Sequence, residues 1–102
     1  MNLFDNSDAP QNGEIFETLF ESKEVLIERI ISSDKQEKKL YKQDHDEWVM
    51  IAQGEALLQL EKERKRLKKG DWLLIKQGIR HQVLETTKGT LWLCVHLKHH
   101  DK

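Results

Sequence analysis

The chain has 102 residues, of which 37% are hydrophobic and 34% are charged, and its formal net charge is −1. This length suits one domain with a lean core, and the balanced charge excludes a global electrostatic attraction to nucleic acid or to a membrane. The single cysteine, Cys94, excludes an intrachain disulfide and a cysteine-based zinc cage.

The amino-terminal segment, residues 1–13, predicts an irregular arm. It is polar and acidic, it is rich in turn-forming residues, and it lacks the basic start and apolar run of a secretion signal. No apolar stretch in the sequence approaches transmembrane length. We therefore expect a soluble protein of a reducing compartment, most simply the cytoplasm.

From Glu14 onward, short apolar runs alternate with polar residues and glycine turns. Several runs are rich in β-branched residues, and the one at Leu40 and Tyr41 is the weakest. Short strands at regular spacing predict an all-β sandwich or barrel. The runs are residues 15–20, 25–31, 40–41, 47–52, 71–75, 81–84 and 91–97.

One segment, residues 56–69, consists almost wholly of good helix formers and by itself predicts a helix. Leu58 and Leu60 alternate with polar residues, however, as in a half-buried strand. A hairpin with its turn near residues 62–65 fits the neighbouring strands better, mainly because of the family resemblance described below. We interpret the basic run at 62–69 as a solvated turn and edge strand.

A dense polar cluster, residues 43–47, leads into the strand expected at 47–52. Carboxylate and imidazole groups entering an apolar strand are costly unless they are paired, which makes this cluster the first candidate for a functional site. If Val49 and Ile51 face the core, Glu47 also faces inward, whereas Trp48 and Met50 face outward.

The spacing of these residues resembles that of small single-domain cupins, which are antiparallel β-barrels of the jelly-roll type. The end of the first cupin motif, a glutamate and a glycine after six residues, corresponds to Glu47 and Gly54. The second motif corresponds to the stretch from Gly70 to His81, with Lys76 in place of the usual proline. The resemblance covers roughly residues 24–97. Residues 41–48 also match a Tyr-x-Gln-Asp-x-Asp-Glu-Trp motif of an uncharacterised cupin subgroup.

The resemblance implies a single cupin-type double-stranded β-helix, or jelly-roll barrel, over residues 14–98, with a polar tail at 99–102. His99 and His100 in this tail are expected to be exposed to solvent. We also expect two copies of the chain to form a homodimer through the apolar amino-terminal strands around Phe16, Phe20 and Ile27.

The family's metal ligands are only partly present. Glu47 and His81 keep ordinary ligand positions, while Tyr41 and Gln43 stand where metal-binding cupins have histidines. A divalent ion (iron, manganese, nickel or zinc) is one reading, with Gln43, His45, Glu47 and His81 as its ligands. The other reading is a direct Glu47–His81 hydrogen bond, with Gln43 recognising an organic ligand.

Other polar residues have two readings each. His45 is either a fourth ligand or a solvated turn histidine. His96 shares a strand face with Cys94 and is either a pocket residue or a satisfied core histidine. The Tyr41 hydroxyl either points into the pocket or packs. Cys94 is expected to be a buried, inert hydrophobe, and Arg80 a surface residue.

The function implied is a barrel pocket that binds a small polar metabolite, with Tyr41, Gln43 and His96 as ligand-binding residues. If the protein is an enzyme, the family implies metal-dependent isomerisation or dioxygenase-like cleavage of a small carbonyl or enol compound. The alternatives are a metal-free ligand-binding or sensor module and a structural dimer with a vestigial pocket.

Overall fold

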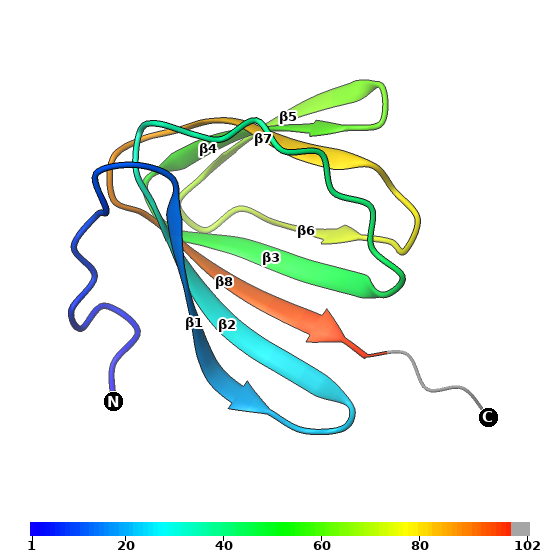
Figure 1. Ribbon diagram of the computed structural model, residues 1–102, viewed down its shortest axis with the longest axis horizontal. Helices are drawn as coiled ribbons and strands as arrows, with labels where there is room; N and C mark the ends of the chain where they lie inside the picture. The colour runs from blue at the N-terminus through cyan, green and yellow to red at the C-terminus, as the bar shows by residue number, and fades with distance from the viewer. Residues whose placement is uncertain (99–102) are drawn as a thin grey trace.

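The computed structural model describes residues 1–98, which form two antiparallel β-sheets (Figure 1). The five-stranded sheet has the order β1-β2-β8-β3-β6, and the three-stranded sheet has the order β5-β4-β7. This confirms the expected all-β barrel. The expected tail, with His99 and His100, lies outside the described residues. The strands are β1 (Glu14–Glu21), β2 (Val25–Ser32), β3 (Asp46–Gln53), β4 (Glu55–Leu60), β5 (Glu63–Lys68), β6 (Trp72–Ile75), β7 (His81–Thr86) and β8 (Thr90–Leu97).

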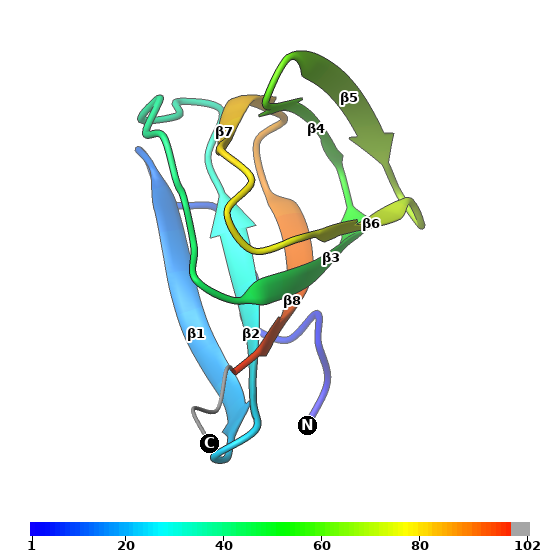
Figure 2. The ribbon, with the colours of Figure 1, turned by 90° about the vertical axis from the view of Figure 1, so that its right-hand side faces the viewer.

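The three-stranded sheet lies across the upper part of the five-stranded sheet, as the two perpendicular views show (Figures 1 and 2). The core between them is built from the alternating inward side chains of both sheets. On β3, Val49 and Ile51 are buried together with Glu47, while Trp48 and Met50 are partly exposed. The expected inward orientation of Glu47 is therefore confirmed. Among the described residues there is no helix able to cross a membrane.

The expectation of a strand at Leu40 and Tyr41 is wrong. Only Tyr41 pairs, in an isolated antiparallel bridge to His81. The amide of Tyr41 donates to the carbonyl of His81 at 2.8 Å, and the amide of His81 donates back at 2.9 Å. Leu40 beside this bridge is 59% exposed and Lys42 is polar, so no buried apolar alternation extends the bridge into a ladder. The bridge fixes the Tyr41 backbone beside β7.

The prediction of a helix from residues 56–69 alone is wrong. The alternative prediction of a hairpin is confirmed, and its two strands are β4 and β5. Ala56 and Leu58 are almost completely buried, and burial on one face of a strand outweighs intrinsic helix propensity. The turn comes earlier than expected, at residues 61–62, where Glu61 has a φ of 51°. A glutamate carries no turn signal of the kind that glycine or asparagine provides.

The motif glycine Gly54 joins β3 to β4 in a conformation that other residues rarely adopt. Its φ is 88°, and a Cβ atom there would lie 2.5 Å from Oγ1 of Thr90. Thr90 Oγ1 itself donates to the carbonyl of Thr87 at 2.8 Å. Gly54 is therefore required both for backbone geometry and for the close approach of β8.

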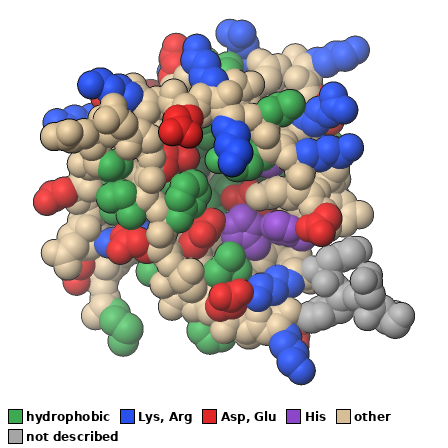
Figure 3. Space-filling model, viewed as in Figure 1, with side chains coloured by type: hydrophobic (Ala, Val, Ile, Leu, Met, Phe, Trp, Pro, Cys, Tyr) green, Lys and Arg blue, Asp and Glu red, His purple; other side chains and the backbone are tan. Residues whose placement is uncertain are grey.

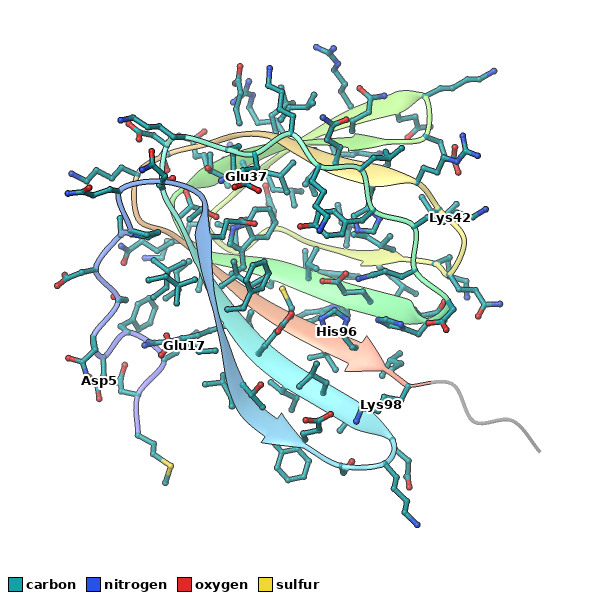
Figure 4. All side chains as sticks on the ribbon, viewed as in Figure 1. Asp5, Glu17, Glu37, Lys42, His96 and Lys98 are labelled. Atoms are coloured by element: carbon teal, nitrogen blue, oxygen red, sulfur yellow. The ribbon has the colours of Figure 1, made fainter. Side chains whose placement is uncertain are left out.

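Residues 1–13 contain no strand, but they are anchored to the barrel by the buried side chain of Arg29. Its guanidinium donates to the carbonyls of Leu3 (2.7 Å), Asp5 (2.6 Å) and Asn6 (3.2 Å), and it pairs with Glu17 at 2.7 Å. Glu17 and Asp5 accordingly lie on the same side of the molecule (Figure 4). This segment covers the side of β2 that faces away from the pocket described next.

Candidate functional site

A cavity of about 90 Å³ lies between the two sheets. Aliphatic and aromatic side chains form much of its wall, and polar groups converge on it from β1, β2, β3, β7, β8 and the chain before β3. Figure 3 shows histidine and acidic side chains beside a hollow lined with hydrophobic ones. The polar lining residues are Glu14, Glu28, Tyr41, Gln43, Glu47, His81 and His96.

The structure brings five of the six residues expected at the site to this cavity: Tyr41, Gln43, Glu47, His81 and His96. His45 is not part of the lining, although it contacts His96. Sequence reasoning missed Glu14 and Glu28. The available signal for Glu28 was a charged residue inside the apolar run 25–31, on the same strand face as Ile30.

His81 is held by its backbone and by its ring. Its Nδ1–H donates to the carbonyl of Ile79 at 3.1 Å, which directs Nε2, the other ring nitrogen, away from this carbonyl. The ring stacks on Tyr41 with a centroid distance of 5.7 Å and an interplanar angle of 21°. Among the described residues there is no hydrogen bond between His81 and Glu47, so the direct pairing weighed above is not formed.

Gln43 carries an acceptor with no partner. Its Oε1 atom is buried, and no hydrogen-bond donor reaches it within the described chain. Buried polar atoms are nearly always hydrogen-bonded, and one that is not lowers stability. Gln43 is also one of the residues that line the cavity, which makes this oxygen a candidate acceptor for a donor group of a bound molecule.

A hydrogen-bonded series runs from the surface to the cavity wall. Nδ1 of His45 lies 3.1 Å from Oδ1 of Asp44, and Nε2 of His45 lies 2.8 Å from Nδ1 of His96. Nε2 of His96 lies 2.8 Å from Oε1 of Glu28 and 3.8 Å from Oε2 of Glu47. The Asp44 side chain is 98% exposed and that of His96 only 11%. Figure 4 shows the position of His96 on β8.

The partners at the two ends determine where the protons lie. The carboxylates of Asp44 and Glu28 only accept hydrogen bonds, so the nitrogens facing them both carry hydrogen. The bond between His45 and His96 requires one more hydrogen. When both carboxylates are ionised, this arrangement places three hydrogens on the two imidazole rings, and the pair then carries one positive charge.

The electrostatics of the cavity agree with this assignment. Burial by itself lowers the pKa of His96, but the hydrogen bond to Glu28 and the charges of Glu47 and Glu28 outweigh burial and raise it. Burial raises the pKa of the Cys94 thiol well above its ordinary value, and Glu47 and Glu28 raise it further. The expectation that Cys94 is buried is confirmed.

The metal set implied by the family resemblance does not fit these residues. Within residues 1–98, no three His, Cys, Asp or Glu side chains are grouped so that they could hold a metal ion. Both ring nitrogens of His45 face Asp44 and His96, so this ring has no nitrogen left for a metal ion. Arg80, which we expected to be a surface residue, is exposed.

Comparisons with known proteins agree with the fold and the motif spacing. The family model described as the cupin domain matches residues 32–96. A protein from Ralstonia eutropha, provisionally named a mannose-6-phosphate isomerase, is 36% identical over 97% of each chain, with a TM-score of 0.88. No curated protein matches the chain.

Two more distant structures share the fold. KdgF from a Halomonas species is 17% identical, with 87% of this chain and 83% of that one covered and a TM-score of 0.79. A cupin superfamily protein from Desulfitobacterium hafniense is 22% identical, with coverages of 90% and 84% and a TM-score of 0.79. The motif spacing, the two-sheet barrel and these matches together show that the chain belongs to the cupin domain family.

Proposed function

We propose that this cupin binds a small polar metabolite directly through the side chains of its barrel pocket, without a metal ion. The observation that carries the proposal is the buried, unpartnered Oε1 atom of Gln43. An unsatisfied buried acceptor costs about 1–3 kcal/mol, a cost that a bound donor removes. Glu47 and His81 line the same cavity and supply further polar contacts.

The experiment is native mass spectrometry of the protein as purified, compared with the variants Gln43→Met and Glu47→Gln. We expect an organic adduct on the wild type that is reduced in both variants. Glu63→Gln is the matched control, because the Glu63 side chain is 73% exposed and lies outside the cavity lining. An adduct retained equally by all four proteins would contradict the assignment of the pocket.

A second candidate is a proton-transfer enzyme such as an isomerase, favoured by the hydrogen-bonded series from Asp44 to Glu28. The series gives the pocket an acid–base pair in contact with solvent. This second candidate is tested by measuring deuterium incorporation from D₂O into fructose 6-phosphate. We choose this substrate because of the name of the Ralstonia relative. Incorporation that is lost in His96→Gln would support it, and no incorporation above the blank would exclude this substrate.

We further propose that two copies of the chain associate through β1. This strand is the outer strand of its sheet, and its side chains Ile15, Phe16, Leu19 and Phe20 are 40–54% exposed. Unpaired edge strands with apolar side chains are usually covered. A second copy of the same strand offers a complementary edge and the same apolar side chains.

A further inference from the structure

Negatively charged side chains outnumber positively charged ones in the lining of the pocket. Three carboxylates reach it: Glu14 from β1, Glu28 from β2 and Glu47 from β3. No lysine or arginine belongs to the described lining. The only compensating positive charge in this set is the one shared by His45 and His96. The cavity wall therefore carries excess negative charge.

The three carboxylates are not equally compensated. Glu28 accepts the hydrogen bond from His96 at 2.8 Å, and Glu14 accepts one from the hydroxyl of Ser32 at 2.6 Å. Glu47 has only the weakly donating thiol of Cys94 as a hydrogen-bond partner and lies 3.8 Å from His96 Nε2, although its side chain is only 8% exposed. A buried carboxylate in this position favours a cationic partner.

Hydrogen-bond acceptors outnumber donors around the cavity. The unpartnered oxygen of Gln43 adds to the carboxylates. The rings of Phe16, Tyr41 and Trp92 are also part of the wall, and aromatic faces attract cations. Lys39 lies outside the lining, and its Nζ is 5.4 Å from the centre of the Tyr41 ring.

The resolved pKa shifts around the pocket point in the same direction. Burial raises the pKa of Tyr41, and the charges of Glu14, Glu37 and Glu47 raise it further. Burial also raises the pKa of Glu14; its hydrogen bond with Ser32 opposes this, and Glu28 adds to it. The same carboxylates raise the pKa of Cys94 and His96. A negative potential of this kind stabilises bound positive charge.

We propose that the ligand of this pocket is a small organic cation, an ammonium, amidinium or guanidinium compound with several N–H donors. This inference rests on the proposed function and specifies its ligand class. The cationic group of the ligand lies beside Glu47, and one of its N–H groups donates a hydrogen bond to Oε1 of Gln43. The carbon skeleton of the ligand packs against the aromatic wall.

The same charges disfavour a phosphorylated sugar. Phosphate groups are held by arginine, lysine or helix N-termini, and the described lining supplies none of these. The cavity volume of about 90 Å³ corresponds to roughly six to nine waters at about 10–15 Å³ each. The charges of the lining therefore favour an amine or guanidine over a hexose phosphate.

The test is an NMR titration with matched pairs of probes at constant ionic strength. The cationic probes are putrescine, methylguanidine and glucosamine, their neutral partners are butanediol, methylurea and glucose, and mannose 6-phosphate is the anion. The reporters are the side-chain amide of Gln43 and the indole N–H of Trp92, both in the cavity wall. We expect saturable shifts with a cationic probe at concentrations at least tenfold lower than with its neutral partner.

Glu47→Gln is expected to weaken cationic binding roughly tenfold, as loss of a charge-assisted hydrogen bond does. Glu63→Gln is expected to leave it unchanged. If Glu47→Gln does not fold, Glu28→Gln takes its place with the same expected direction.

The outcomes separate this inference from the proposed function. If a neutral probe or mannose 6-phosphate binds as tightly as the cations, the pocket is a binding site but the charge inference is wrong. A neutral or anionic adduct in the mass spectrum leads to the same conclusion. If no probe shifts the reporters, the cation inference fails, and the absence of any adduct as well would overturn the proposed function.

Discussion

Nδ1 of His96 lies 2.8 Å from Nε2 of His45, although the two residues are 51 positions apart in the chain. This bond joins the last strand of the barrel to the polar segment that precedes β3. It also links an exposed carboxylate, Asp44, to the pocket wall through two imidazole rings. The two rings are therefore linked by one hydrogen bond across the edge of the pocket.

The first prediction concerns the pH dependence of stability. The folded-state pKa of His96 is raised, so its contribution to the free energy of unfolding is fully present below the unfolded value of about 6.5. It is lost as pH rises through the folded-state pKa. Urea unfolding of the wild type and His96→Gln across this range checks the sign. The advantage of the wild type should shrink as pH rises, and an advantage that grows with pH would refute the assignment.

The second prediction concerns Gln43 in the ligand-free protein. Replacement by methionine, which is similar in size and has no carbonyl, removes the unsatisfied acceptor. We expect Gln43→Met to stabilise the ligand-free fold by about 1 kcal/mol. Urea unfolding after removal of any adduct measures the change. A loss of stability would mean that the amide makes a favourable contact in the fold.

The third prediction compares two glycines. Gly54 and Gly70 have similar φ values, 88° and 90°, but only at Gly54 would a Cβ meet other atoms within 4 Å. Gly70→Ala should cost about 1–2 kcal/mol for the left-handed backbone. Gly54→Ala should cost a further 1–3 kcal/mol, roughly, for the contact with Thr90. Equal losses in thermal or urea unfolding would show that β8 can move away at no cost.

The fourth prediction tests association through β1. Phe20 is 54% exposed and lies outside the cavity lining, so a charge there should disrupt a dimer without changing the pocket. Sedimentation equilibrium should give a dimer for the wild type and a monomer for Phe20→Glu. Trp72→Glu, at a residue 61% exposed on β6, is the control and should remain dimeric. A monomeric wild type would contradict the proposed association through β1.

The parts of the fold that the sequence predicted follow local rules. Alternation placed Glu47 on the buried face of β3, and motif spacing placed Gly54 and His81. The position of the β4–β5 turn was missed because Glu61 takes a left-handed φ that its residue type does not indicate.

The polar contacts of the pocket were missed because they depend on strand register. Glu28 pairs with Cys94 across β2 and β8, which places it diagonally opposite His96 on one sheet face. Residues 68 positions apart meet there, and no local pattern specifies that register. The His45–His96 bond likewise depends on the path of the segment before β3.

The central claim is that the pocket acts through its own side chains rather than through a metal ion. Elemental analysis of protein purified without chelators tests it most directly, with Glu47→Gln and His81→Ala measured in parallel. The account predicts substoichiometric metal in all three proteins and a melting temperature of the wild type that EDTA does not change. One equivalent of a divalent metal in the wild type, lost in both variants, would contradict it.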